Sequence, residues 1–167
     1  MPRSRRLRIR RAGLAFVATA LLAAVPVVTP RLPGATAATP NPAGYWLSGG
    51  DGSVYSYGSA GDLGSLRGTK LSKPVVGMAP TPTGAGYWMV ASDGGIFSFG
   101  DAKFFGSTGN IKLNQPIVGM APTPTGRGYW FTAADGGIFA YGDAAFLGSA
   151  GNQGLKSPVV AFVARRV

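Results

Sequence analysis

The stretch GYWMVASDGGIFSFG, residues 86–100, decides the fold of this chain. It recurs as GYWLSGGDGSVYSYG at 44–58 and as GYWFTAADGGIFAYG at 128–142, a period of 42 residues without a gap. Between the second and third copies, 20 of 33 aligned positions are identical, which chance does not produce. The pattern indicates internal repeats. We infer one domain over residues 38–167, made of three repeats at 44–85, 86–127 and 128–167.

Each repeat predicts four short strands. Residues 87–92 are aromatic and β-branched, and residues 95–99 alternate between apolar and small side chains, which is typical of two paired strands. Asp93-Gly94 between them suits the two-residue type I′ turn of a hairpin. A third strand is expected at 103–106 and a fourth at 116–121. No part of residues 38–167 has helical periodicity bounded by caps, so the fold class is all-β.

Four strands in a repeat of this length are typical of a β-propeller blade. A β-trefoil is the alternative, since it closes three four-stranded repeats within one chain. Propellers have four to eight blades, so three repeats leave a ring incomplete. The expected last strand, 158–163, could pair with the first hairpin of another chain. We therefore expect a homodimer that completes a six-bladed ring.

The repeats resemble those of a known family. The segments GYWMVASDGGIFSFGDAKFFGSTG and PIVGMAPTPTGRGYW are similar to the tandem repeats of secreted bacterial proteins that are classed as β-propeller-like. The resemblance extends over residues 44–164. It implies a propeller-like fold and an extracellular location, and it brings no catalytic residues with it.

The N-terminal region has the three-part pattern of an export signal. Six arginines lie within residues 3–11 and precede an apolar run at 12–28, which is short for a transmembrane helix and contains Pro26. The small-residue triplet that ends at Ala37 offers a cleavage site. We expect residues 1–37 to be removed after export by the general or the twin-arginine route, with an uncleaved membrane anchor as the alternative. The domain would then be secreted or associated with the cell surface.

Composition excludes several classes of function. The chain has no Cys, His or Glu, so it lacks the ligands of a zinc site and the members of a Ser-His or Cys-His pair. A calcium site needs more oxygen ligands than one Asp per repeat supplies, and a glycosidase needs two carboxylates at a defined separation, so the composition favours neither without excluding either. The net charge of +10 falls to +3 without the leader, and no run interleaves basic with aromatic residues. We therefore expect neither an enzyme nor a nucleic-acid-binding protein, with no metal and no cofactor.

The candidate ligand-binding residues are those that recur. Exposed aromatic rings at repeated positions would suit stacking on sugar rings, and Asp or Asn side chains could bond the sugar hydroxyls. A core role for the aromatic residues is the alternative. The turn aspartates 51, 93 and 135 are explained by turn chemistry. The candidates are Trp46, Trp88, Trp130, Tyr87, Tyr129, Asp101, Asp143, Asn110 and Asn152.

Two functions fit these features. The first is a lectin-like module that binds envelope or extracellular polysaccharide through repeated weak sites. The second is an extracellular scaffold for protein–protein interaction, which would depend on positions that vary between repeats, such as Lys103, Lys112 and Arg127.

Overall fold

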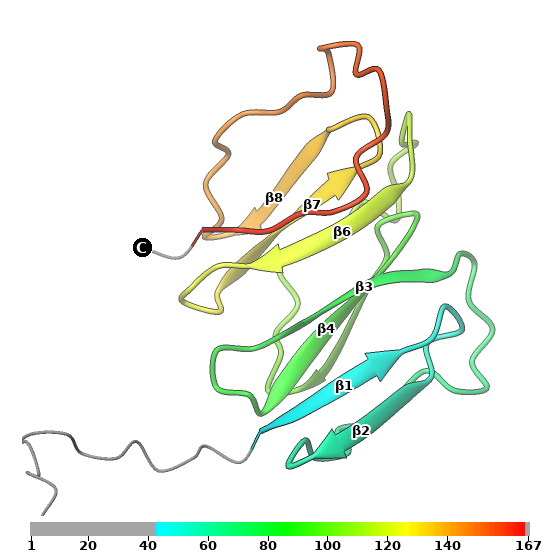
Figure 1. Ribbon diagram of the computed structural model, residues 1–167, viewed down its shortest axis with the longest axis vertical. Helices are drawn as coiled ribbons and strands as arrows, with labels where there is room; N and C mark the ends of the chain where they lie inside the picture. The colour runs from blue at the N-terminus through cyan, green and yellow to red at the C-terminus, as the bar shows by residue number, and fades with distance from the viewer. Residues whose placement is uncertain (1–42, 166–167) are drawn as a thin grey trace, which may run out of the picture. The chain divides into compact units, whose positions relative to one another are not determined.

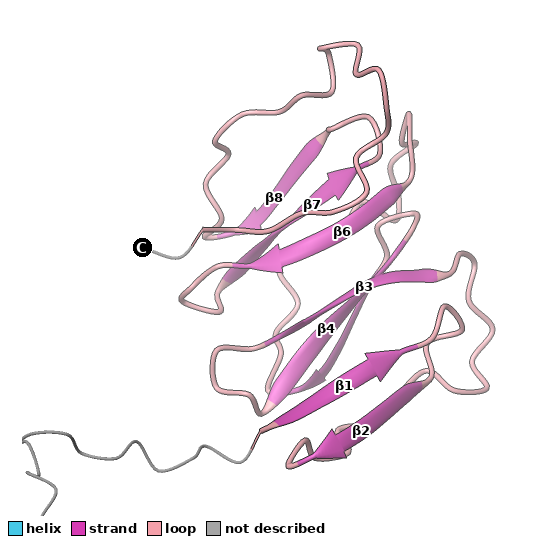
Figure 2. Ribbon diagram, viewed as in Figure 1, coloured by secondary structure: helices cyan, strands magenta, loops and turns pink. Residues whose placement is uncertain are grey.

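Eight short strands form three separate antiparallel sheets in residues 43–165, the part of the chain that the computed structural model describes (Figures 1 and 2). These residues contain no helix, and so no helix able to cross a membrane. The all-β class predicted from the sequence is confirmed. The export signal predicted at residues 1–37 lies outside the described residues.

The first sheet has two strands, in the order β1-β2, and the other two sheets have three each, in the orders β3-β4-β5 and β6-β7-β8. All neighbouring strands are antiparallel. The strands are β1 (Gly44–Ser48), β2 (Val54–Gly58), β3 (Val75–Pro80), β4 (Gly86–Ala91), β5 (Ile96–Gly100), β6 (Ile117–Pro122), β7 (Gly128–Ala133) and β8 (Ile138–Gly142).

The sheets are offset from the sequence repeats. The last strand of one repeat pairs with the first strand of the next repeat, as β6 does with β7, where Met120 lies opposite Phe131. Each three-stranded sheet therefore takes its strands from two repeats. The turn of Thr123–Arg127 brings β6 back against β7 at once, and the sheets have two or three strands instead of the four expected of a blade.

The third strand expected at 103–106 is not formed. Its backbone groups are bonded by side chains instead of by a neighbouring strand. The indole of Trp88 donates to the carbonyl of Lys103, and the hydroxyl of Tyr129 accepts from Phe105 N and donates to Gly106 O. Phe105 N, a single donor, is thereby not available to a strand ladder.

The last strand expected, at 158–163, is also not formed, since these residues pair with no strand in the described chain. No sheet in residues 43–165 closes on itself. The structure therefore establishes an all-β protein of three small sheets, and the propeller and the trefoil both stay predictions.

The hairpin turns differ from the predicted type I′ turn. Gly94 N donates to Ala91 O at 2.8 Å, and Gly94 has a φ of +79°, whereas Asp93 does not have a positive φ. A type I′ turn would place both Asp93 and Gly94 in the left-handed region. The longer turn places only the glycine there, which removes the steric cost of a β-carbon on the aspartate.

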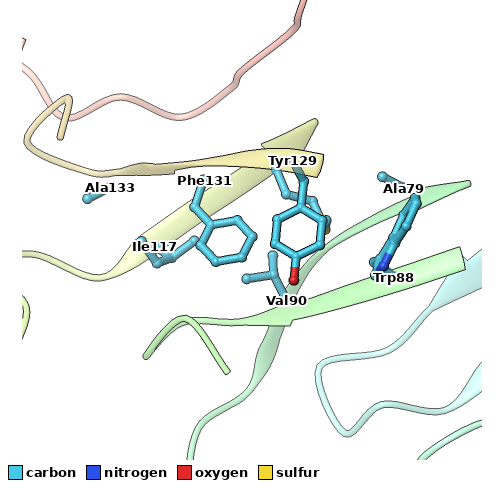
Figure 3. Packing of buried hydrophobic residues seen from close by; sticks show 8 residues of the cluster. Ala79, Trp88, Val90, Ile117, Tyr129, Phe131 and Ala133 are labelled. Carbon is cyan, nitrogen blue, oxygen red and sulfur yellow. The ribbon is translucent and has the colours of Figure 1, made fainter. Parts of the chain in front are cut away.

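The core lies where successive sheets pack against each other. Tyr129 and Phe131 of β7 are fully buried against Trp88 and Val90 of β4 (Figure 3). The ring of Tyr129 stacks on Phe131 with centroids 5.2 Å apart and meets the edge of Trp88 at 5.8 Å. Burial of one such side chain stabilises the fold by roughly 1.5–3 kcal/mol. Tyr87 and Met89 of β4 form the equivalent cluster against the first sheet.

Candidate functional site

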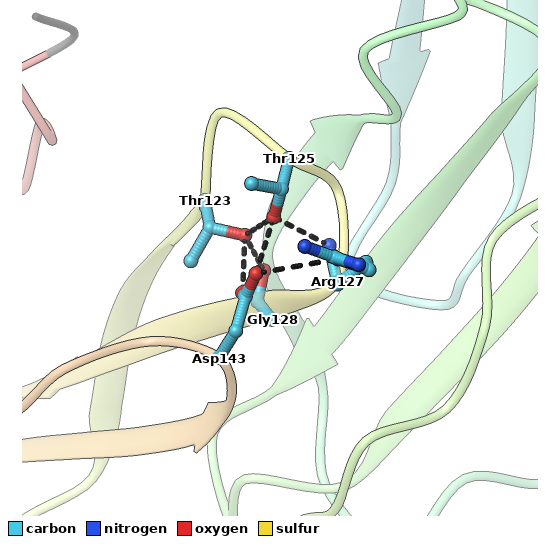
Figure 4. Close-up of polar contacts among 5 residues, drawn as sticks. All are labelled: Thr123, Thr125, Arg127, Gly128 and Asp143. Carbon is cyan, nitrogen blue, oxygen red and sulfur yellow. Dashed lines mark hydrogen bonds and ion pairs between the residues drawn. The ribbon is translucent and has the colours of Figure 1, made fainter.

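Asp101 and Asp143 occupy equivalent positions just after β5 and β8. The carboxylate of Asp143 accepts hydrogen bonds from Thr123 Oγ1 at 2.8 Å and from Thr125 Oγ1 at 2.5 Å (Figure 4). Asp101 accepts the same two bonds, at the same distances, from the equivalent threonines of the second sheet. Each aspartate therefore ties the end of the last strand to the turn between the other two strands.

These hydroxyl donors lower the pKa of both carboxyl groups. At Asp101 the hydroxyl of Thr83 has the largest effect on the pKa, and at Asp143 the hydroxyl of Thr125 does. The Arg127 guanidinium, with its Nε 3.6 Å from Asp143 Oδ2, lowers the pKa of Asp143 further. Both carboxylates are charged at neutral pH and already hold two donors each. Their part in ligand binding stays a prediction.

The tryptophans attach loops to the sheets. Trp88 is fully buried, and Trp46 and Trp130 are half-buried. Their indole Nε1 groups donate to the carbonyl oxygen 15 residues later in each repeat, which belongs to Gly61 (2.8 Å), Lys103 (2.7 Å) and Ala145 (2.8 Å) respectively. A fully buried ring such as Trp88 has no face open for stacking on a sugar.

Tyr87 and Tyr129 join one sheet to the preceding one. Both side chains are fully buried. The hydroxyl of Tyr87 donates to Gly64 O, and the hydroxyl of Tyr129 donates to Gly106 O at 2.7 Å. Burial raises the pKa of both tyrosines. Their positions fit the core role that the sequence left open beside ligand binding.

Asn110 and Asn152 are exposed, in loops beside the hairpin turns. These loops are attached to the turns by the bonds from Thr108 N to Gly94 O and from Ala150 N to Gly136 O. Asp101 and Asp143 lie at the opposite end of the sheets. The structure therefore does not bring the predicted Asp and Asn candidates together.

Three equivalent grooves, here called the turn grooves, lie at the hairpin turns. Each is lined by the turn aspartate, by the residue before it, and by a leucine and a proline of the loop that follows the hairpin. Their volumes are about 280, 300 and 350 Å³ in the first, second and third repeats. The shared lining residues are Gly50, Asp51, Leu71 and Pro74; Ser92, Asp93, Leu113 and Pro116; and Ala134, Asp135, Leu155 and Pro158.

Neighbouring turn grooves share a wall. Lys73 lines both the first and the second groove, and Gln115 lines both the second and the third. The grooves therefore form a row along one end of the sheets.

The turn aspartates present acceptors to these grooves. One carboxylate oxygen of Asp93 and of Asp135 accepts the backbone N–H two residues later, at 3.0 and 2.9 Å. Their second oxygens have no hydrogen-bond partner among the described residues and could accept a ligand hydroxyl. Asp51 differs, because Ser53 bonds both of its oxygens and thereby lowers its pKa.

The third turn groove continues into a second hollow of about 340 Å³. Asp135 and Gln115 line both hollows, and the second also contains the exposed ring of Phe146 and the amides of Asn114 and Asn152. Of the predicted candidates, Asn152 lines this second hollow. The turn aspartates were not among the predicted candidates, because turn chemistry already explains an aspartate at these positions. The leucines and prolines of the grooves carry no sequence signal that distinguishes them from other loop residues.

The described residues contain no cluster of three Asp, Glu, His or Cys side chains that could hold a metal ion. What the turn grooves offer is carboxylate and amide hydrogen bonding beside apolar walls. No protein-family model matches the chain, and a comparison with curated proteins finds no significant match.

Proposed function

We propose that the protein is a secreted, non-catalytic binding module that recognises a polysaccharide of the cell envelope or the extracellular space. The row of three turn grooves carries this proposal, since neighbouring grooves share Lys73 or Gln115. A polymer with a repeating unit can occupy several of them at once, so that weak sites add up to useful avidity.

The chemistry of the grooves supports a neutral, hydroxyl-rich ligand. The unpaired oxygens of Asp93 and Asp135 are acceptors for hydroxyl groups, and the exposed amide of Gln115 can both donate and accept. Leu113 and Leu155 supply apolar walls for the C–H faces of a sugar ring. A few polar groups placed against apolar surface are typical of small-ligand sites.

The proposal includes the architecture and the location. The three sheets would be blades of a propeller-like protein, as the resemblance to secreted bacterial repeat proteins implies. Such a rigid body would present the grooves without catalysis, metal or cofactor, and without binding nucleic acid. Export would be followed by cleavage near Ala37.

The test compares the retention of the purified protein on insoluble peptidoglycan and on extracellular polysaccharides, with free sugars as eluents. Saturable retention that one sugar reverses is expected. Asp93→Asn and Asp135→Asn keep the acceptor that closes each turn and remove the charge from the groove. Each should weaken binding about tenfold, the effect of losing about 1.4 kcal/mol, and the double variant should bind more weakly than either.

Asp143→Asn is the matched control, because it makes the same change at the opposite end of the third sheet. It should leave retention unchanged. Loss of retention in Asp143→Asn with none in Asp93→Asn or Asp135→Asn would place the site at the Thr–Asp end instead. Absence of retention on every glycan would overturn the lectin-like proposal.

A protein-interaction scaffold is the second candidate function. Phe104 and Phe146 occupy equivalent positions in two repeats, and both rings are largely exposed. Exposed aromatic residues at a surface are typical of protein-binding sites. Lys103 beside Phe104 varies between repeats, as such a role requires. Capture of a protein partner that Phe104→Ala abolishes and Asp135→Asn does not would favour the scaffold.

A further inference from the structure

The first sheet lacks the strand that completes the other two. In the second and third sheets, β3 and β6 pair with the free edges of β4 and β7. In the first sheet no described strand pairs with the equivalent edge of β1. Among the described residues, the backbone groups along that edge are the place where another strand could be added.

Residues 159–164 are the repeat equivalent of β3 and β6, and they are placed like them. Val75 N and Ile117 N each bond a carbonyl of the preceding hairpin turn at 2.9 and 2.8 Å, and Val159 N bonds Ala134 O at 2.8 Å in the same way. A β-carbon on Gly119 would lie 3.5 Å from Phe162 Cβ, so the segment follows β6 closely. The segment thus occupies the place of β3 and β6 in its repeat, but it pairs with no strand of the described chain.

The aromatic face of the first sheet is also uncovered. Tyr45 is 58 % exposed, whereas its equivalents Tyr87 and Tyr129 are completely buried by the preceding sheet. Leu47 is likewise exposed, although both residues at its position in the other sheets are buried. The ring of Tyr45 stacks on that of Tyr57 within the same sheet, with centroids 5.1 Å apart. This face has the residues of an inter-sheet contact without the partner.

A second face, on the third repeat, exposes the apolar residues that in the other repeats pack against the next sheet. Leu147 is 86 % exposed, whereas Leu63 and Phe105 at its position are half-buried against the next sheet. Val163 is 87 % exposed, whereas Ala79 and Ala121 at its position are 4 % and 7 % exposed.

This second face contains a pocket of the right kind for a tyrosine. Tyr129 is enclosed by Trp88, Phe105 and Gly106 of the preceding repeat. A pocket of about 230 Å³ lies at the same place one repeat later, and its lining residues include the equivalents Trp130, Leu147 and Gly148 together with Phe162 and Val163.

The space beside Gly148 is also unfilled, although the equivalent space beside Gly106 is occupied by a ring. A β-carbon on Gly106 would collide with the ring of Tyr141, whereas a β-carbon on Gly148 would meet nothing within 4 Å. The repeat equivalent of Tyr141 that could cover Gly148 is Tyr57, an exposed ring of the first sheet.

We infer that residues 159–164 of one chain complete the first sheet of a second copy of this chain, with Tyr45 of the second copy filling the pocket beside Trp130 and Gly148. This contact has the equivalent residues in the same arrangement as the interfaces between the first and second sheets and between the second and third sheets. It buries the apolar side chains that are exposed at both faces.

The internal sheets fix the register of the new pairing. Met78 lies opposite Met89, and Met120 lies opposite Phe131. The equivalent pair between chains is Phe162 opposite Leu47. The hydroxyl of Tyr45 would donate to Gly148 O of the other chain, as that of Tyr129 does to Gly106 O.

The contact is heterologous, because two different faces meet, and it must close into a ring or continue as a filament. Rings of four to eight blades are the sizes that propellers adopt. Six is the only multiple of three in that range. The inference is therefore a closed ring of two chains with two identical contacts.

The test measures the mass of the purified protein in solution by size-exclusion chromatography with light scattering. A dimer is expected. Tyr45→Asp and Leu147→Asp place a charge on one face each, at exposed side chains that the fold of a single chain does not need, and each should give a monomer. Phe104→Asp is the control, since Phe104 is just as exposed but lies outside both faces, and it should stay dimeric.

Mixing the two monomeric variants separates this contact from a symmetric one. The Tyr45→Asp chain keeps an intact third-repeat face and the Leu147→Asp chain keeps an intact first-sheet face, so the mixture should form one contact and a dimer of one chain of each kind. A monomeric wild-type protein, an open-ended polymer, or a mixture that stays monomeric would each overturn the inference.

Cysteines can test the register, because the chain has none of its own. Leu47→Cys with Phe162→Cys places the two thiols directly opposite each other, and oxidation should link two chains covalently. Leu47→Cys with Val163→Cys shifts one residue along the strand and points the thiols to opposite faces of the sheet. This second pair should stay unlinked, and equal cross-linking of both pairs would overturn the register.

Discussion

Removal of one hydroxyl tests how the sheets are joined. In Tyr129→Phe the ring stays and the hydroxyl is lost, together with its bonds to Gly106 O at 2.7 Å and from Phe105 N at 2.9 Å. Since the Tyr129 side chain is fully buried, water cannot easily replace either bond. A buried group left without its partner costs about 1–3 kcal/mol. We expect the free energy of unfolding to fall by about 2–3 kcal/mol.

The assay is equilibrium unfolding in urea at one fixed protein concentration. For a domain of this size, a loss of 2–3 kcal/mol also lowers the melting temperature by roughly 6–12 °C. Tyr141→Phe is the matched control: it is the same change in the same repeat, the Tyr141 hydroxyl has no hydrogen bond in the described chain, and the second repeat has Phe99 at that position. If both variants lose equally little stability, the hydroxyl of Tyr129 does not join the sheets as described.

Two further changes test local features of the fold. The double variant Asp101→Asn and Asp143→Asn should lose less stability in acid than the wild type. The pKa of each carboxyl group is lowered in the fold. Its stabilising effect is therefore present above the ordinary pKa of about 3.9 and is lost as the pH falls through the lowered value. Urea midpoints measured against pH check this, and parallel curves for variant and wild type would contradict it. Gly94→Ala should lower the free energy of unfolding more than twice as much as Gly84→Ala. Both glycines have a positive φ, which costs an alanine about 1–2 kcal/mol. The new β-carbon would in addition collide with Thr108 at Gly94, whereas it would meet nothing at Gly84. Equal losses in thermal unfolding would show that Thr108 moves away freely.

The hairpins could be predicted because their signal is local. Alternation in residues 95–99 and the turn at Asp93-Gly94 specify a strand pair within 15 residues, and β4 and β5 form as expected. The pairing of a fourth strand with the next hairpin is predicted only between chains, where residues 158–163 are expected to pair with the first hairpin of another chain. Within one chain a repeated sequence has no marked starting point, so the strand at 116–121 is equally compatible with the sheet before it and the sheet after it.

The roles of the recurrent side chains were harder to predict. An aromatic residue that recurs in every repeat can serve the core or a ligand, and Trp88 and Tyr129 look the same in either case. Which role applies depends on whether a second sheet covers the side chain, and that is a property of packing. The same holds for Asp101, whose two threonine partners lie 18 and 20 residues away in the chain.

The offset of sheets and repeats connects the two proposals. β3 and β6 each belong to one repeat but pair with the hairpin of the next repeat. Lys73 and Gln115, the residues that neighbouring grooves share, lie just before these two strands. In a ring of two chains, residues 159–164 would pair in the same way with the first hairpin of the other chain, and Ser157 would take the place of Lys73 and Gln115 between two grooves. The row of three turn grooves would then become a ring of six on one face. A variant that is monomeric through Tyr45→Asp should accordingly keep each groove and lose avidity for a long polysaccharide, while its affinity for a short oligosaccharide stays unchanged.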